Sequence, residues 1–316
     1  MLNITDAEKK ALKARGIILT NDGEHFIERV LSSNGVFTNE QMQIITDCAK
    51  KYGNGKVALT TRLTMEIQGI PFENVEACFE EIQAEGHMYI GGTSSLVRPV
   101  VACKGTVCVH GLMDTQGFSD RVFNEFYLKW HTVRLPHKFK IGIGGCPNNC
   151  VKPGFHDFGI MGQSVPDYDP DLCNACSKCS VIGTCLVKAA TQDEDGNLVI
   201  DADKCTNCGK CIGACNFDSI EEKERGYKVT IGGIWGKTQR MATPVPGIYS
   251  EDEVMKLIEK AILLYREQGI TGERFGRTID RIGPDNFIAQ LLADDVLDRK
   301  QEILDAKLHL VGGATC

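Results

Sequence analysis

Residues 173–215 read CNACSKCSVIGTCLVKAATQDEDGNLVIDADKCTNCGKCIGAC, and this stretch holds eight cysteines in two groups. In each group three cysteines are separated by two-residue gaps. This spacing wraps one face of a [4Fe–4S] cluster, and the fourth ligand comes from the other group. We therefore predict two [4Fe–4S] clusters, one on Cys173, Cys176, Cys179 and Cys215 and the other on Cys205, Cys208, Cys211 and Cys185. Zinc and disulfides are the competing interpretations, but two near-identical C-x2-C-x2-C triplets are unusual for zinc.

The segment around these cysteines, residues 166–225, is dense in Cys, Asp and Asn and poor in large apolar side chains. It cannot build much of a hydrophobic core, so a bound cofactor is needed to hold it together. Its second cysteine group keeps the C-x2-C-x2-C-x3-C spacing of bacterial ferredoxins, whereas the first has five residues before Cys185. We predict that 166–225 is an inserted 2[4Fe–4S] domain of the bacterial ferredoxin type.

On both sides of this segment, helical and strand patterns are mixed, which predicts an α+β architecture. We expect residues 1–95 to form one unit, and 96–165 and 226–316 to form a second unit that the insertion interrupts. Helices are expected over 38–52, 72–86, 118–130 and 250–268, with one or two more over 286–307. Strands are expected over 56–70, over 138–143 and from residue 227 onward.

The composition of the whole chain narrows its class. Its 316 residues include 15 cysteines, 12 of them in tight groups, which favours metal ligation over scattered structural thiols. No apolar run approaches the roughly 20 residues of a membrane span, and the first residues lack the apolar core of a signal peptide. The net charge of -7 gives no support to a nucleic-acid partner. We expect a cytoplasmic protein, in which disulfides are disfavoured.

A second set of cysteines lies before the insertion. Cys103 and Cys108 are separated by four residues, and Cys146 and Cys150 by three. Two such pairs could supply the four thiolates of a third [4Fe–4S] cluster, or they could be buried thiols or a zinc site.

The residues around these pairs carry a family resemblance. Residues 59–70 read LTTRLTMEIQGI, 102–111 ACKGTVCVHG, 135–150 LPHKFKIGIGGCPNNC and 272–287 GERFGRTIDRIGPDNF. Together they resemble the sirohaem sulfite and nitrite reductase family, over residues 38–165 and 226–290. The resemblance implies one repeat of that family, a ferredoxin-like half domain plus a sirohaem- and cluster-binding domain. A ferredoxin inserted within a single repeat is most similar to the C subunit of the anaerobic sulfite reductases.

The resemblance also implies roles for particular residues. Cys103, Cys108, Cys146 and Cys150 would hold a [4Fe–4S] cluster, and Cys150 would bridge it to the sirohaem iron as axial ligand. The substrate oxyanion would be bound, and protons delivered, by Arg62, Arg98, Lys138 and Lys140. In this chain the first pair has four intervening residues, where the assimilatory enzymes have five.

Other residues in the same domain are candidates on their own chemistry. Gly142, Gly144 and Gly145 suit a close backbone approach to a flat cofactor. Proton donors could include His110, His131, His137 and His156. Lys237 and Arg240 could bind carboxylates of sirohaem. Cys48 and Cys78 lie on the apolar faces of helices and are expected in the core, and Cys316 is expected to be an exposed thiol.

From this resemblance we predict the catalytic subunit of an anaerobic-type sulfite reductase, which reduces sulfite to sulfide by six electrons that enter through the inserted ferredoxin. No nucleotide-binding fingerprint is present, so electrons must come from partner proteins. The resemblance implies one flavin-containing, NADH-oxidising subunit and one ferredoxin-like subunit. The single-chain assimilatory relatives carry the repeat twice, so we expect an oligomer in which a second copy of this chain, or a different subunit that carries the repeat, completes the site. The alternatives are a sirohaem nitrite reductase and a polyferredoxin subunit without catalysis.

Overall fold

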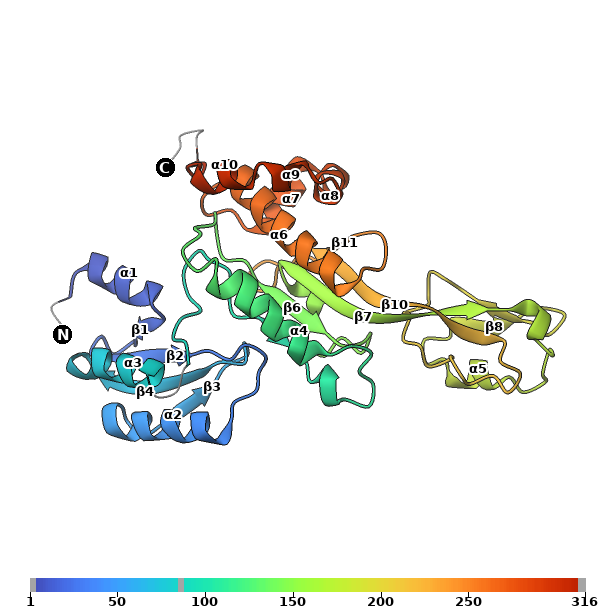
Figure 1. The fold of residues 1–316 in the computed structure, drawn as a ribbon, viewed down its shortest axis with the longest axis horizontal. Coiled ribbons are helices and arrows are strands. Elements are labelled where there is room, and N and C mark those ends of the chain that lie inside the picture. Colours follow the sequence, from blue (N-terminus) through green and yellow to red (C-terminus); the bar gives the residue numbers. More distant parts are fainter. Residues whose placement is uncertain (1–3, 85–87, 312–316) are drawn as a thin grey trace.

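The computed structural model describes residues 4–84 and 88–311, and it begins with a small α+β unit (Figure 1). Its strands β1 (Ile17–Leu19), β2 (His25–Val30), β3 (Val57–Leu59) and β4 (Met65–Pro71) form an antiparallel sheet in the order β1-β2-β4-β3. Helix α1 (Asp6–Ala14) precedes the sheet. Helix α2 (Asn39–Tyr52) lies between β2 and β3, and the 3-10 helix η1 (Phe72–Asn74) and α3 (Val75–Ala84) follow β4.

Local sequence signals explain these elements. Thr38 caps α2 in a capping box with Gln41, which satisfies two backbone N–H groups at the helix start. Helices α2 and α3 bury Ile45, Cys48, Val75, Cys78 and Ile82 in one core with the sheet. The helices and strands predicted over 38–84 are therefore confirmed, with two strands in 56–70, and both thiols are core as expected. Residues 85 and 86 of the second predicted helix lie outside the described residues.

The central unit is built on a five-stranded mixed sheet in the order β11-β10-β7-β6-β5. Strands β5 (Val101–Ala102), β6 (Ile141–Gly144) and β7 (Phe158–Tyr168) pair in parallel, and β10 (Ile220–Ile231) and β11 (Thr243–Pro244) continue the sheet antiparallel. All four residues of β6 are buried, which is typical of parallel strands covered on both faces. The 3-10 helices η2 (Gly105–Val107) and η4 (Pro153–Phe155) lie in the connections.

Helices cover this sheet and complete the main core. Helix α4 (Thr115–Val122) continues into a π-helical turn, η3 (Phe123–Leu128), where a helix was predicted over 118–130. Helix α6 (Glu251–Gln268) has the Ser250–Glu253 capping box and confirms the helix predicted over 250–268. The segment predicted as one or two final helices is instead three short ones, α8 (Pro284–Leu292), α9 (Asp295–Asp298) and α10 (Lys300–Asp305). The break after α8 places Asp294 against Lys260, a lysine of α6 with only 6% of its side chain exposed.

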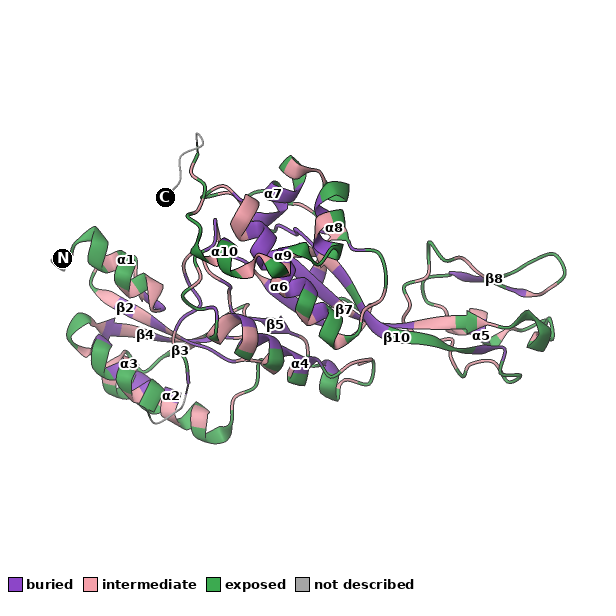
Figure 2. Ribbon diagram, turned by 45° about the horizontal axis from the view of Figure 1, so that its top comes forward, coloured by how far each residue is buried: buried purple, intermediate pink, exposed green. Residues whose placement is uncertain are grey.

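Aromatic side chains join these helices to the sheet. Phe275 on α7 (Phe275–Ile282) packs against Phe139, Tyr265 and Phe287, with ring centroids 5.1 to 5.4 Å apart. Figure 2 shows how burial concentrates in the central strands and α6. No described helix is both long and apolar enough to cross a membrane.

A long two-stranded ribbon carries the cysteine-rich insertion away from the sheet (Figure 1). Strands β7 and β10 pair over their whole length to Tyr168 and Ile220, with a bulge near Glu222. The strand predicted from residue 227 thus begins earlier, and both strands run past the predicted domain boundary positions, Pro166 and Arg225. Residues 169–219 therefore leave and rejoin the ribbon at adjacent points.

The insertion has little regular structure of its own. It contains the 3-10 helix η5 (Pro170–Leu172), α5 (Ser180–Thr184) and an antiparallel pair, β8 (Ala190–Gln192) and β9 (Leu198–Ile200). Its buried core consists of Val181, Ala190, Leu198 and Ile220, with several cysteines packed against it. Such a small core agrees with the expectation that this segment depends on bound cofactors.

Candidate functional site

Four cysteines meet where β5 and β6 end. Cys103 follows β5 and precedes η2, and Cys108 follows η2; Cys146 and Cys150 lie in the turn after β6. Burial raises the pKa of the Cys146 thiol, and the charges of Cys103, Cys150 and Cys108 raise it further, so the four thiols are neighbours. The backbone N–H of Gly145 donates to Cys103 Sγ at 3.1 Å, a contact that stabilises a thiolate ligand.

The predicted glycines of this turn have packing reasons within the chain. A Cβ on Gly145 would stand 2.9 Å from the Cα of Gly105, and one on Gly142 would stand 2.7 Å from the His156 ring. Only glycine allows this close approach of the two cysteine loops. Gly144 faces Pro153 more loosely, at 3.2 Å. Contact with a flat cofactor stays a prediction for Gly144 and Gly145.

The insertion brings its cysteines together in crosswise sets. One hollow of about 70 Å³ is lined by Cys173, Cys176, Cys179 and Cys215, and another of about 30 Å³ by Cys185, Cys205, Cys208 and Cys211. Each set combines three cysteines of one group with the last cysteine of the other, as the spacing predicts. All fourteen described cysteines are free thiols.

Hydrogen bonds to sulfur favour thiolates at these positions. Burial raises the pKa of Cys185, but the backbone N–H groups of Ala190 and Ala189 lower it on balance. The Ser219 hydroxyl donates to Cys215 Sγ at 3.1 Å and lowers its pKa. Thiolates that accept such bonds are the ligands that iron–sulfur clusters use.

Within residues 4–84 and 88–311, no three His, Cys, Asp or Glu side chains form a group that could hold one metal ion. A [4Fe–4S] cluster distributes its four thiolates over four irons, so clusters on these cysteine sets stay a prediction.

One cysteine set of the insertion lies beside the set at the end of β6. A hollow of about 150 Å³ is lined by Cys146, Pro147 and His110 from one side and by Cys208 and Lys210 from the other. Ser164 on β7 anchors this arrangement, because its backbone N–H donates to Asn207 O at 2.9 Å. The Cys208 set is therefore nearer to Cys146, and the hollow of the Cys173 set lies elsewhere in the insertion.

Four cations predicted for the site lie close to one another. Arg62 is in the turn between β3 and β4, Arg98 precedes β5, and Lys138 and Lys140 precede β6. The strand predicted over 138–143 begins only at Ile141, because Phe139 makes an isolated bridge to Val97 instead. Phe139, between the two lysines, is buried. That Lys138 and Lys140 project to the same side stays a prediction.

None of these four cations forms an ion pair in the part of the chain that the structure describes. The Arg62 guanidinium donates to Pro99 O and that of Arg98 to Gly92 O, and the Nε atoms of both are buried without a partner. Burial, together with neighbouring arginines, lowers the pKa of Arg62 and Arg98 to about 10 each. Orphaned donors and uncompensated charge are the features of an anion site.

The pKa of Lys140 lies well below the ordinary value for a lysine. Burial, followed by the charges of Arg62, Arg274 and Lys138, lowers its pKa to about 8. The pKa of Lys138 is lowered for the same reasons. A lysine with such a pKa can release a proton near neutral pH, which a general acid must do.

Two charged residues of this cluster were missed by sequence reasoning. Arg274 lies in the 272–287 motif, and Asp157 directly precedes β7; they pair at 2.9 Å. Asp157 also accepts the backbone N–H of Lys140 at 2.9 Å. The available signal was the position of Asp157, a charged residue directly before the largely apolar segment 158–165. Its partner Arg274 could not be predicted, because 117 residues separate the two in sequence.

The four candidate histidines fall in different places. His137 and His156 lie among the cations, and burial together with those charges lowers the pKa of each to about 4, so both are neutral at pH 7. His110 lines the hollow beside Cys146, and the ring of His131 contacts Leu128 O at the end of η3. Only the first two are placed with the cations.

The remaining basic candidates are Arg240 and Lys237. The Arg240 guanidinium is occupied by Asp280, Thr243 and backbone carbonyls, so it holds the chain together instead of reaching for a ligand. Lys237 is exposed. Cys316 lies outside the described residues.

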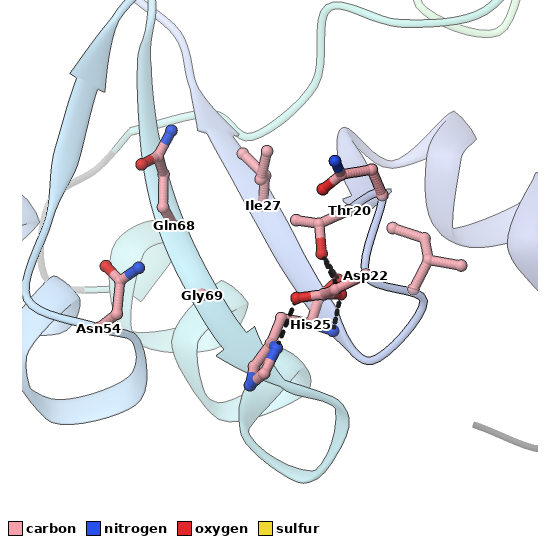
Figure 3. Close-up of a pocket in the computed structure, with 9 residues that line it drawn as sticks. Thr20, Asp22, His25, Ile27, Asn54, Gln68 and Gly69 are labelled. Carbon is pink, nitrogen blue, oxygen red and sulfur yellow. Dashed lines mark hydrogen bonds and ion pairs between the residues drawn. The ribbon is translucent and has the colours of Figure 1, made fainter. Parts of the chain in front are cut away.

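A larger hollow lies in the first unit, away from the cysteines and cations (Figure 3). It measures about 660 Å³, and its walls include Thr20, Asp22, His25 and Asn54. Asp22 accepts from the Thr20 hydroxyl at 2.5 Å and from the His25 backbone N–H at 3.0 Å, and it contacts His25 Nδ1 at 2.9 Å. These bonds fix the conformation of the β1–β2 turn, so the role of Asp22 is to stabilise that turn.

Comparison with known proteins agrees with this geometry. Residues 93–299 match the family described as nitrite and sulphite reductase 4Fe-4S domain, and 18–85 match the nitrite/sulfite reductase ferredoxin-like half domain. The chain belongs to the nitrite and sulfite reductase family. The resemblance stated from its motifs is thereby confirmed, as is a fold of ferredoxin-like half domain plus 4Fe-4S domain.

The chain is similar in sequence or fold to individual members of the nitrite and sulfite reductase family. It is 32% identical over 87% of its length to a coenzyme F420-dependent sulfite reductase of Methanocaldococcus jannaschii, of which it spans 43%. It is 31% identical over 52% of its length to the C subunit of the anaerobic sulfite reductase of Salmonella typhimurium, of which it spans 50%. A crystal structure of dissimilatory sulfite reductase I shares the fold, with a TM-score of 0.68 at 22% identity over 85% of this chain and 69% of that one.

Proposed function

We propose that this chain is the catalytic subunit of a sirohaem-dependent sulfite reductase, which reduces sulfite to sulfide by six electrons. The observation that carries the proposal is the group of four partly buried cations that form no ion pair among the described residues, in a chain whose net charge is -7. Such a concentration of positive charge is costly unless an anion binds there. The similarity to sulfite reductases supports sulfite as that anion.

The residues present fit the cofactors that the family implies. Free thiols at Cys103, Cys108, Cys146 and Cys150 would hold the cluster coupled to sirohaem, with Cys150, which is exposed, as the bridging ligand. The orphaned Nε atoms of Arg62 and Arg98 suit either the oxyanion or carboxylates of sirohaem. When bound, sirohaem and the clusters supply the redox chemistry, and the protein supplies orientation and charge.

The chain's own side chains have separate tasks in this proposal. Arg62 and Arg98 bind the sulfite oxygens, because a guanidinium presents a fork of donors that matches an oxyanion. Lys138 and Lys140 hold protons for the oxygens that leave as water. The low pKa of Lys140 suits this role, since transfer is most efficient from an acid whose pKa is near the working pH.

The inserted segment would act as the electron inlet, with two [4Fe–4S] sites on its crosswise cysteine sets. The set containing Cys208 lies beside Cys146, which supports it as the inner site, and the Cys173 set would then be the outer one. The donor proteins, a flavin-containing NADH-oxidising subunit and a ferredoxin-like subunit, remain part of the proposal.

We also propose that the site is completed by a second copy of the chain. Lys140 and Cys146 are at opposite ends of β6, and a four-residue strand alone spans roughly 13 Å. The cations of one copy would thus face the sirohaem ligated by the other, as in an isologous dimer. Fully active enzyme that is monomeric in solution would contradict this arrangement.

Anaerobic turnover with a low-potential dye as donor tests the proposal. We expect sulfide from sulfite, with a higher kcat/KM than for nitrite. Preference for nitrite would instead support the sirohaem nitrite reductase, which performs six-electron chemistry at the same kind of centre. Protein that lacks sirohaem and reduces neither anion would support the polyferredoxin alternative.

A further inference from the structure

One carboxylate is buried within the cation cluster. Asp157 has no exposed surface, and both of its oxygens lie 2.9 Å from Arg274 Nη2. Its Oδ2 also accepts the backbone N–H of Lys140 at 2.9 Å. A buried carboxylate is stable only with such partners, so its position is fixed by the two residues that it binds.

Asp157 holds Lys140 together with the start of β7. While the Asp157 carboxylate takes the Lys140 N–H, the next residue, Phe158, donates its own N–H to Lys140 O at 2.9 Å. The backbone of Asp157 is fixed as well, since its carbonyl accepts from Gly232 N–H at 2.7 Å. Both backbone groups of Lys140 are thus bound by residues 157 and 158.

Burial raises the pKa of the Asp157 carboxyl, but Arg274 and the Lys140 N–H oppose this, and because both of its oxygens face donors the group is held as a carboxylate that offsets positive charge in the cluster. This carboxylate opposes the lowering of the pKa at Arg62, Arg98, Lys138 and Lys140, all of which lack an ion pair within the described residues. The neighbouring Glu66 is engaged by Arg29 at 2.6 Å. Without Asp157, the four cations and Arg274 would repel each other, and the part of the chain that the structure describes places no other fully buried carboxylate among them.

We propose that Asp157 is a positioning residue and a built-in counter-anion of the cation cluster. It fixes Lys140 and Arg274 and keeps the cluster assembled while no substrate anion is bound. The inference deepens the proposed function, because it concerns the same anion site. It makes a prediction about charge that a purely structural Asp–Arg link would not make.

Thermal melting of the purified full-length protein, in chloride and in phosphate of equal ionic strength, tests this. Asp157→Asn keeps an acceptor for the Lys140 N–H but removes the charge, so we expect its Tm to fall by about 5–10 °C in chloride. Inorganic phosphate should restore at least half of that loss by replacing the missing anion. The control is Asp294→Asn, which breaks the ion pair of the buried Lys260 outside the cluster. Phosphate should raise the Tm of this variant by no more than it raises the Tm of the wild type.

Two further variants separate charge balance from structural linkage. Arg274→Gln removes a cation, so phosphate should restore none of its Tm loss. The double variant Asp157→Asn/Arg274→Gln loses one charge of each sign, so its Tm in chloride should be higher than that of Asp157→Asn. If Asp157→Asn does not fold, a double variant that folds gives the same result. A double variant no more stable than Asp157→Asn, or a Tm loss that phosphate leaves unchanged, would overturn the proposal. Because melting with phosphate requires neither sirohaem nor turnover, its outcome is independent of whether sulfite is the substrate.

Discussion

Lys140 and Cys146 lie at the two ends of β6, so the cation cluster and the cysteine set nearest to it are separated by a strand whose four residues are all buried. Cations and cysteines at opposite ends of one strand would serve two different cofactor sites in a symmetric dimer. This relationship leads to a complementation test.

If sites are shared between copies, two inactive variants should restore activity when mixed in one dimer. We expect Lys140→Met and Cys150→Ser each to abolish sulfite reduction. Random co-assembly at equal amounts should regain about a quarter of wild-type activity, because half of the dimers then contain one intact site out of two. The measurement is turnover of the co-expressed protein without separation of the three kinds of dimer. Heterodimers as inactive as either parent would show that each chain completes its own site.

Lys140 should give the reaction a basic limb in its pH profile. Its pKa of about 8 is below the ordinary lysine value, so the side chain holds its proton below pH 8 and loses it above. We expect kcat to fall as the pH rises through about 8. Lys140→Arg keeps the positive charge but not the titration, so it should bind sulfite with a KM near wild type, lower kcat by about 100-fold and lose the limb. An unchanged limb in this variant would assign the titration to another group.

The three cysteine sets should be separable by substitution. Cys150→Ser should lose the sirohaem spectrum and activity while it retains the clusters of the insertion. The matched variant Cys173→Ser should lose about four irons and keep the sirohaem band. Iron analysis and visible spectra of the two proteins check this. Loss of sirohaem in Cys173→Ser would contradict the assignment of that set to the insertion alone.

Glu28 should make the stability of the first unit depend on pH. It lies on β2 with no exposed surface, and neither carboxylate oxygen has a hydrogen bond of normal geometry, although the Cys78 thiol is near. Burial raises its pKa to about 8 from 4.5, so between these values the folded protein holds a proton that the unfolded chain has released. Stability should therefore be full below pH 4.5 and fall as the pH rises toward 8, by up to ~1.4 kcal/mol per pH unit.

Glu28→Gln should remove this dependence and stabilise the protein at pH 8 more than at pH 5. Chemical denaturation at the two pH values measures it. Glu80→Gln, on the exposed side of α3, is the control and should change neither value. Equal effects of Glu28→Gln at both pH values would mean that the carboxyl is not protonated in the folded state.

The sequence was most informative where the determinants are local. Cysteine gaps of two residues predicted the sets that line the two hollows of the insertion, and the helices predicted over 38–52 and 250–268 match α2 and α6. Long-range contacts were not predictable in this way. Asp157 and Arg274 meet only after β6, β7 and α7 have packed, and the early start of β10 at Ile220 depends on its pairing with Tyr168. Neither partner carries a local pattern that names the other.

The proposed function requires that one chain hold a sirohaem centre and three [4Fe–4S] clusters. An anaerobic visible spectrum of the purified protein, combined with iron and acid-labile sulfide counts, checks this requirement. We expect about twelve cluster irons per chain, one further iron in sirohaem, and a red-region sirohaem band. About eight irons with no absorption beyond that of the clusters would contradict it.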